Sequence, residues 1–203
     1  MQSAEIELKF PVADPAALQS RLPALGFLLE TPRTFESNTL YDTANRTLRE
    51  SGQILRVRQY GELWTVTHKR HPDDEDPANI DTHYKVRIET ETTVTDGPAL
   101  AEIFKCLGYA PMFRYEKYRT EWSYPAGPGN CHLVVDETPI GNFAELEGPI
   151  EWIDRTIAQL CIDPSACITD SYGRLFLTWK IQIGSPAENL TFSEIPAFAT
   201  VTC

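Results

Sequence analysis

The sequence predicts a single α+β domain, in which strands with one charged face and one apolar face pack against amphipathic helices. Three observations predict this fold class. Eight segments alternate charged or polar residues with apolar ones at the period of two that is typical of half-buried strands. Four other segments carry apolar residues at helical spacing. A strand–helix–strand pattern also occurs twice, at a constant offset of 82 positions.

The first half of the domain is predicted to begin with a strand at 5–10, where charged and apolar residues alternate. A helix is expected over 14–25, because Asp14 is a favourable N-cap and Pro15 suits the first turn. The remaining strands of this half are predicted at 35–41, 53–60 and 62–69.

The middle of the chain, 71–83, has few apolar residues and includes an acidic run from Asp73 to Asp76. We predict a solvated loop there rather than a metal site. The second half then has predicted strands at 84–91, 113–124, 131–137 and 142–147, and predicted helices at 96–107, 150–161 and 170–182. Residues 1–183 form the predicted domain, and 184–203 form an irregular tail draped over it.

The two copies of the strand–helix–strand pattern agree at the acid of the strand, the N-cap, an apolar helix position and the residues that end the helix. The matching pairs are Glu7/Glu89, Asp14/Asp96, Leu18/Leu100, Gly26/Gly108 and Phe27/Tyr109. Five agreements in one ungapped register favour a shared architecture over chance.

Composition excludes several classes of function. Lys and Arg number 18 against 29 Asp and Glu, for a formal net charge of −11, which argues against a nucleic-acid-coating or anionic-membrane-binding protein. No apolar run approaches the roughly 20 residues of a membrane span, and charged residues at the N-terminus do not fit a secretory signal. Five cysteines without a CxxC pair predict free thiols and a cytoplasmic location.

Sorting the strand residues by face gathers the charges of both signs on one side. That face holds eight acids and seven bases: Glu5, Glu7, Glu89, Glu91, Glu121, Asp136, Glu145 and Glu147 with Lys9, Arg56, Arg58, Lys69, Arg87, Lys117 and Arg119. One interpretation is a sheet whose polar face meets water and carries cross-strand ion pairs. The other is a barrel with the charges inside and helices covering its apolar outside.

An interior of mixed charge requires ligands, because unpaired buried charges are too costly. Clustered carboxylates bind hard cations such as Mg²⁺ or Mn²⁺, and clustered Arg and Lys bind phosphate oxygens. The barrel interpretation therefore predicts a site for a polyphosphate complexed with metal ions.

The order of motifs resembles the CYTH superfamily, the triphosphate tunnel metalloenzymes. The resemblance covers about residues 3–177 and starts from Glu5-x-Glu7-x-Lys9. It continues through Gly52-Gln53-Ile54-Leu55-Arg56-Val57-Arg58, Thr67-His68-Lys69, Arg87-x-Glu89-x-Glu91, Lys117-x-Arg119, Val135-Asp136-Glu137, Gly141-x-Phe143-x-Glu145-Leu146-Glu147 and Ser171-Tyr172. It implies an eight-stranded antiparallel β-barrel that forms a tunnel with a charged lumen and external helices.

The resemblance also implies roles for the charged residues. The metal ligands would be Glu5, Glu7, Asp136, Glu145 and Glu147, holding two Mg²⁺ or Mn²⁺ ions. The phosphate cradle would be Lys9, Arg56, Arg58, Lys69, Lys117 and Arg119, with Glu89, Arg87 and Glu91 as supporting tunnel residues. Lys69 would also be catalytic and assist the attack of water.

Three activities are compatible with such a cradle. The resemblance favours hydrolysis of inorganic triphosphate, thiamine triphosphate or a nucleoside triphosphate, a small-molecule substrate. A class IV adenylate cyclase is the alternative, although proven cyclases resemble one another in a longer stretch before the ExExK motif than the four residues found here. A non-catalytic polyphosphate or nucleotide binder is the third. Some relatives dimerise, so a homodimer is compatible with the resemblance.

Overall fold

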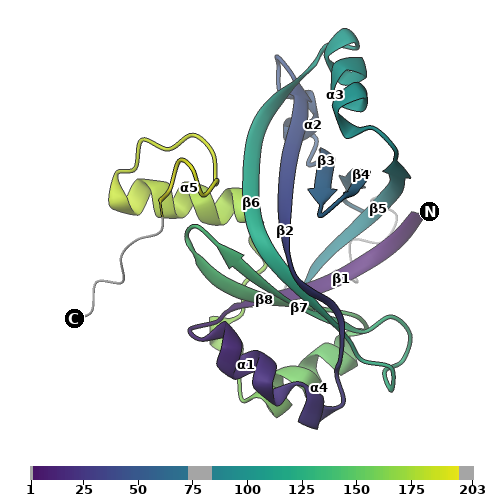
Figure 1. Cartoon of the computed structure of the whole chain (residues 1–203), viewed down its shortest axis with the longest axis vertical. Coiled ribbons are helices and arrows are strands. Elements are labelled where there is room, and N and C mark those ends of the chain that lie inside the picture. The colour runs from purple at the N-terminus through teal and green to yellow at the C-terminus, as the bar shows by residue number, and fades with distance from the viewer. Residues whose placement is uncertain (1, 73–83, 197–203) are drawn as a thin grey trace.

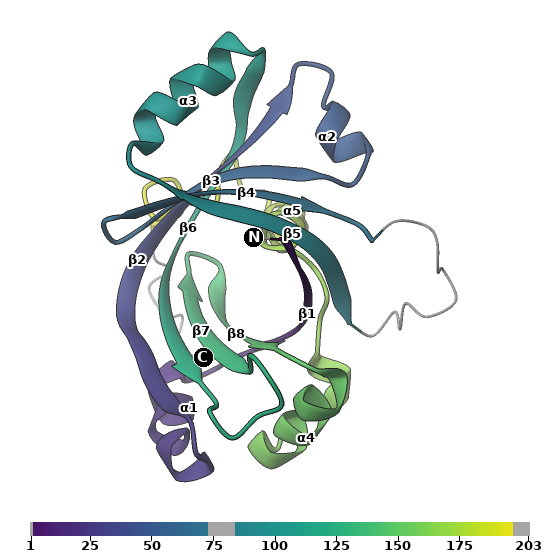
Figure 2. The same cartoon turned by 90° about the vertical axis from the view of Figure 1, so that its right-hand side faces the viewer.

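The computed structural model describes residues 2–72 and 84–196, and in this part of the chain eight antiparallel strands close into a barrel (Figures 1 and 2). Neighbouring strands follow the order β1-β5-β4-β3-β2-β6-β7-β8, and β8 pairs with β1. The strands are β1 Gln2–Pro11, β2 Leu28–Thr43, β3 Ile54–Tyr60, β4 Leu63–Arg70, β5 Lys85–Val94, β6 Tyr109–Ser123, β7 His132–Thr138 and β8 Gly141–Glu147. The predicted eight-stranded antiparallel barrel is confirmed.

Strand β1 closes the barrel by pairing with a different neighbour along each half of its length. Its first half pairs with β5, with Glu5 opposite Arg87, and its second half pairs with β8, with Lys9 opposite Glu145. The alternation of β1 therefore directs its charged side chains toward the same interior as those of β5 and β8.

Strand β2 is much longer than the predicted segment 35–41, and β6 begins four residues before the predicted segment 113–124. They pair along most of their length, with register shifts near Thr31 and at Tyr41. Pro32 and Pro111 interrupt the alternating pattern in the sequence, because proline lacks the N–H that a ladder needs. The irregular register accommodates the prolines, so the strands continue past the limits of the pattern.

Among the residues that the structure describes, five α-helices accompany the barrel: α1 Pro15–Arg21, α2 Thr47–Glu50, α3 Gly97–Cys106, α4 Ile150–Leu160 and α5 Tyr172–Ile183. The predicted helix over 14–25 is interrupted, since α1 ends at Arg21 and a 3₁₀ turn, Pro23–Leu25, follows it. The short helix α2 was not predicted, because four residues show no helical period. Asp42 stabilises the start of α2 by accepting hydrogen bonds from the backbone N–H groups of Leu48 and Arg49.

The predicted internal repeat is confirmed as two β–α–β units, β1–α1–β2 and β5–α3–β6. Asp14 caps α1 by accepting from the N–H of Ala17 at 3.0 Å, and Asp96 caps α3 by accepting from Ala99 at 2.9 Å. Both connections then turn through a glycine in the left-handed region, at φ 93° for Gly26 and 88° for Gly108.

The apolar core lies outside the barrel. Leu8 and Phe10 on β1 point away from the charged interior and pack with Leu133 and Leu146 against α1 and α4. Figure 2 shows these two helices side by side at one end of the barrel. The helices thus cover the apolar strand faces, as the barrel interpretation predicts.

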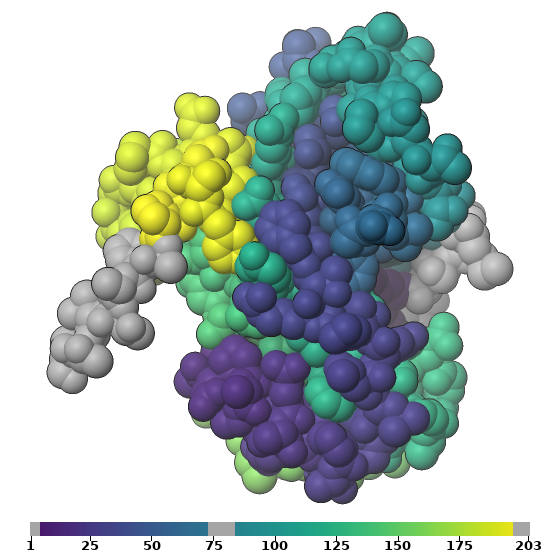
Figure 3. Space-filling model, viewed as in Figure 1, coloured from purple at the N-terminus to yellow at the C-terminus, as the bar shows by residue number. Residues whose placement is uncertain are grey.

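A second apolar cluster joins α5 and the C-terminal segment to strand β6. It includes Tyr115, Tyr172, Phe176 and Leu190. Residues 185–196 form no helix or strand. A backbone hydrogen bond attaches this segment to β6, because Glu116 donates its N–H to the carbonyl of Leu190 at 2.8 Å. Figure 3 shows this part of the chain in yellow, beside the teal surface of β6.

The predicted loop at 71–83 and the end of the predicted tail, 197–203, fall outside the described residues except for 71 and 72. None of the helices in the described part of the chain combines the length and apolar character needed to cross a bilayer.

Candidate functional site

The barrel encloses a cavity of about 370 Å³ that is lined mainly by charged side chains. Twelve of the fourteen predicted site residues line it: Glu5, Glu7, Lys9, Arg56, Arg58, Lys69, Glu89, Glu91, Lys117, Arg119, Glu145 and Glu147. Glu30, Lys85 and Glu121 complete its charged lining, which brings eight carboxylates together with seven cations. We call this space the tunnel cavity.

Strand alternation explains how so many charges enter one space. Lys9 is 2% exposed and Glu7 is 5% exposed, while their neighbour Phe10 is buried in the outer apolar core. A strand reverses the direction of its side chains at every residue, so the charged residues that alternate with the outer apolar ones share the inward face. Alternation thus separates the charged face of each strand from its apolar face, and closure of the barrel makes the charged face the interior.

Three glutamates form the most crowded group of carboxylates in the described part of the chain. Carboxylate oxygens of Glu5, Glu7 and Glu147 all lie within 4.8 Å of one another. Glu7 and Glu147 are direct partners in the pairing of β1 with β8, which places their side chains next to each other. We call these residues the glutamate trio.

The electrostatics of the glutamate trio fit a divalent cation. Burial, followed by repulsion from Glu5, raises the pKa of Glu147 to about 8. Hard cations such as Mg²⁺ prefer carboxylate oxygens, and a bound cation would remove this repulsion. The trio is therefore the set of residues best suited to hold a metal ion.

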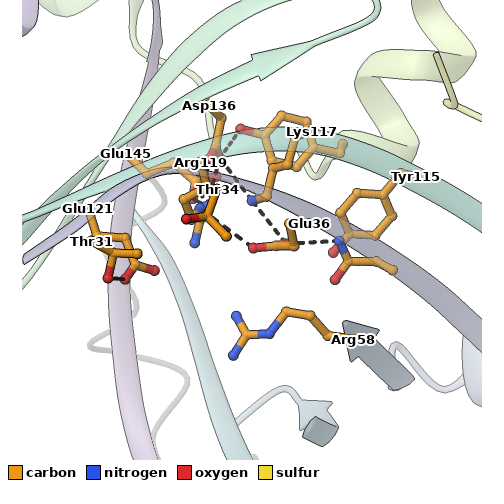
Figure 4. A network of polar contacts seen from close by, with 12 residues as sticks. Thr31, Thr34, Glu36, Arg58, Tyr115, Lys117, Arg119, Glu121, Asp136 and Glu145 are labelled. Carbon is orange, nitrogen blue, oxygen red and sulfur yellow. Dashed lines mark hydrogen bonds and ion pairs between the residues drawn. The ribbon is translucent and has the colours of Figure 1, made fainter. Parts of the chain in front are cut away.

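Asp136 has a different environment from the trio, although the resemblance groups them together as metal ligands. It is fully buried and accepts a hydrogen bond from Lys117 at 2.9 Å, two from Arg119 at 2.7 Å and one from the Tyr172 hydroxyl at 2.6 Å. Figure 4 shows Asp136 meeting Lys117 and Arg119. These donors occupy both carboxylate oxygens, so the geometry makes Asp136 an anchor for the cradle cations.

Glu145 also forms ion pairs with cations of the cavity. It lies 2.6 Å from Lys9 and 2.6 Å from Arg119. Burial opposes its ionisation, but Lys9 and Arg119 outweigh burial and hold the pKa of Glu145 well below its usual range. Glu145 is therefore an ionised carboxylate between two cradle residues and the glutamate trio.

Glu36 is a buried acid that is absent from the predicted set of inward-facing charges. Its side chain is 0% exposed, lies 3.5 Å from Lys117 and accepts a hydrogen bond from Asn38 at 2.8 Å (Figure 4). Burial would raise its pKa, but Lys117 and Arg119 lower the pKa of Glu36 to about 2. Sorting the predicted strand 35–41 by face would have found it, because Glu36 and Asn38 share one face.

Strand β5 contributes a different cation from the predicted one. Lys85 lines the tunnel cavity and pairs with Glu7. Arg87, the predicted residue, does not line it: its guanidinium donates to the carbonyl of Val86 and contacts His71 at 3.1 Å. Lys85 lies two positions before Arg87 on the alternating face, so the same pattern could have identified it.

Lys69 lies beside the glutamate trio. Its ammonium is 3.0 Å from Glu5 and also pairs with Glu89. Burial, followed by the positive charge of Arg56, lowers the pKa of Lys69 below its usual value. The lysine thus occupies the border between the carboxylates and the cradle.

The arginines of β3 form the opposite wall of the cavity. Arg56 and Arg58 both approach Glu91, at 3.4 Å and 3.1 Å. Arg56 also donates to Thr67 and to the hydroxyl of Tyr115. These contacts hold two guanidinium groups toward the interior, where their remaining N–H donors suit phosphate oxygens.

Comparison with known proteins agrees with this arrangement. Residues 3–154 match the CYTH domain. The chain is 27% identical over 152 residues to a protein of Methanocaldococcus jannaschii named "Putative adenylate cyclase MJ0240", which covers 74% of this chain and 80% of that protein.

Solved structures with 20% identity or less share the fold. A Vibrio parahaemolyticus structure described as a putative adenylate cyclase superposes with a TM-score of 0.70 at 20% identity, covering 85% of this chain and 97% of the other. A Hippeastrum protein, described as a putative adenylyl cyclase with a dominant triphosphatase activity, has a TM-score of 0.59 at 16% identity and covers 88% and 96%. The domain match over three quarters of the sequence, with the closed barrel and its charged interior, establishes that this chain belongs to the CYTH family.

Proposed function

We propose that this protein is a metal-dependent phosphohydrolase that cleaves a triphosphate inside the barrel. The observation that carries the proposal is the pairing of the glutamate trio with arginines and lysines in one enclosed cavity. A triphosphate needs both groups, because its negative charges repel a nucleophile until cations neutralise them.

The cradle residues proposed to bind the phosphate oxygens are Lys9, Arg56, Arg58, Lys117 and Arg119. Asp136, Glu36 and Glu145 fix three of these cations in place, which reduces the reorganisation needed when the substrate arrives. The arginines can contact two phosphate oxygens each and hold the chain in line for displacement.

The glutamate trio is proposed to hold Mg²⁺ or Mn²⁺, with Glu145 nearby as a supporting carboxylate. When bound, such an ion supplies Lewis acidity toward phosphate oxygens and lowers the pKa of water. Lys69 is proposed to be catalytic, because it lies beside Glu5 and faces the cradle. Its task is to orient the attacking water and accept its proton.

Adenylate cyclase activity is the second candidate, and the names of the relatives favour it. Both the Methanocaldococcus protein and the Vibrio structure carry that description. The same cradle would then hold ATP so that the 3′-hydroxyl attacks the α-phosphate and expels pyrophosphate. The description of the Hippeastrum protein joins the two activities and gives triphosphatase activity the larger part.

One set of assays separates the candidates. Purified protein is incubated with inorganic triphosphate, thiamine triphosphate or ATP, each with Mg²⁺ or Mn²⁺. Orthophosphate release supports the phosphohydrolase, whereas cyclic AMP with pyrophosphate supports the cyclase. Tight binding without any product would overturn both and leave a polyphosphate-binding protein.

A further inference from the structure

A second cavity adjoins the tunnel cavity where α5 begins. It has a volume of about 490 Å³ and lies between the segment around α2, the start of β3 and the first turns of α5. We call it the α5 cavity. The two cavities share four lining residues, Leu40, Ile54, Ser171 and Gly173. The α5 cavity therefore lies next to the tunnel cavity at these residues.

Basic side chains dominate the charged lining of the α5 cavity. The basic residues are Arg46, Arg49, His71, Arg87, Arg174 and Lys180, and the carboxylates are Asp42 and Glu188. Asp42 is committed to the backbone, because its oxygens accept from the N–H groups of Thr43, Leu48 and Arg49. A local excess of positive charge is unusual in a chain of net charge −11.

The arginines of the α5 cavity differ from the cations of the tunnel. Each of the seven tunnel cations pairs with a carboxylate. Within residues 2–72 and 84–196, the guanidinium groups of Arg46, Arg49 and Arg174 have neither a carboxylate within 4 Å nor a hydrogen bond. These three groups are available to an anionic ligand.

The N-terminus of α5 adds an independent attraction for anions. The first N–H groups of an α-helix lack intrahelical partners, and the helix dipole places partial positive charge there. Ser171 caps the helix by accepting from the N–H of Arg174 at 3.3 Å, and Gly173 lies at the junction of the two cavities. A phosphate chain that leaves the tunnel at this end meets the helix terminus and then the arginines.

We propose that the α5 cavity binds phosphate groups that lie outside the tunnel. Arginine forks recognise phosphate in a bidentate manner, and several of them converge on this space. The phosphate has two sources: later groups of a chain longer than three phosphates, or free phosphate. The first source rests on the proposed function, because it requires a triphosphate segment in the tunnel.

Binding measurements on two variants test the proposal. The double variant Arg46→Ala/Arg174→Ala removes two guanidinium groups from different elements, and Arg46→Lys/Arg174→Lys retains the charge. Arg155→Ala on α4 is the matched control, because Arg155 is an exposed helical arginine remote from both cavities. Calorimetry with Mg²⁺ gives the Kd for inorganic triphosphate and tetraphosphate in a Lys69→Ala background, and for orthophosphate in the otherwise unaltered chain.

We expect tetraphosphate to lose about tenfold more affinity than triphosphate in the double alanine variant, and lysines to restore only part of this loss, because they keep the charge but not the bidentate fork. A different result would assign the cavity to free phosphate: the double alanine variant loses tenfold in orthophosphate affinity, while the ratio of its Kd for tetraphosphate to its Kd for triphosphate is unchanged. The proposal is overturned if the double alanine variant matches the Arg155→Ala control in both the tetraphosphate-to-triphosphate Kd ratio and the Kd for orthophosphate. Absence of turnover on every triphosphate would defeat the proposed function but leave these binding ratios measurable.

Discussion

At the scale of single residues, the site depends on buried acids that hold buried cations. Glu36, Asp136 and Glu145 lie against Lys9, Lys117 and Arg119, with little or no exposure to solvent. A buried ion pair adds little stability by itself, but the loss of one partner leaves an uncompensated charge. Under the proposed function, these acids hold the cations in place for the phosphate oxygens.

Glu36 makes this dependence testable through pH. Its pKa is about 2 in the folded chain against an ordinary value of 4.5. Its stabilising contribution is therefore complete above about pH 4.5 and is lost as the pH falls toward 2. We expect Glu36→Gln to cost about 3–5 kcal/mol at neutral pH and to weaken the acid sensitivity of that window.

Urea unfolding between pH 2 and pH 7 provides the measurement for Glu36. Glu62→Gln is the matched control, because Glu62 is exposed in the turn between β3 and β4. Equal stability of Glu36→Gln and Glu62→Gln across this range would contradict the anchoring role of Glu36.

Lys69 is tested through kinetics. We expect Lys69→Ala to lower kcat by roughly 10²–10⁴-fold while KM for the triphosphate changes little, since general-base catalysis supplies rate rather than affinity. Lys69→Arg keeps the positive charge beside Glu5 but cannot accept a proton at neutral pH. Full turnover in either variant would remove Lys69 from the catalytic role.

The charged residues were the most predictable part of the site. Alternation alone placed Glu5, Lys9 and Arg119 on one face, and the structure brings them to one cavity. Alternation could not distinguish Asp136 from the glutamate trio, because both face inward and only tertiary contacts show which acid meets cations. Arg87 shares the inward face but bends toward His71 at the edge of the barrel.

At the scale of elements, the repeated β–α–β unit was predictable because its signals are local. An N-cap acid, a proline in the first turn and a terminal glycine each act within a few residues. The lengths of β2 and β6 were not predictable from local signals, because pairing across the barrel extends both strands past their prolines.

Asp14 and Asp96 cap their helices in the same way, so we expect them to contribute equally to stability. We expect Asp14→Ala and Asp96→Ala each to cost about 1 kcal/mol of unfolding free energy, since each removes one hydrogen bond from the first turn of its helix. Asn also caps helices, so Asp14→Asn and Asp96→Asn should retain most of that stability. Urea midpoints of the four variants provide the comparison, and equal loss in the Ala and Asn pairs would contradict the capping role.

At the scale of the whole molecule, closure of the barrel could not be derived from the strand pattern. A sheet with one face in water and a barrel with a charged lumen have the same alternation, so the family resemblance selected the barrel. The structure shows why the charged face is enclosed: the strands close on themselves, and α1 and α4 pack on their outer apolar faces. In a closed barrel whose apolar faces are covered by helices on the outside, the charged faces of the strands line the interior.

Closure also makes the proposed polyanionic substrate compatible with a net charge of −11. The charged lining of the tunnel cavity is nearly balanced in sign, and the acid excess lies elsewhere in the chain. Divalent cations bound at the glutamate trio would make the net charge of the cavity positive, which favours a negatively charged substrate. Activity should therefore be strictly dependent on a divalent metal.

The most direct test of the central claim is orthophosphate release from inorganic triphosphate, followed with Mg²⁺ or Mn²⁺ and again in excess EDTA. We predict release with metal and none with EDTA, and the return of activity when metal is added back. Release that persists fully in EDTA would contradict the account of a tunnel in which metal-bound glutamates and a cationic cradle act on one triphosphate.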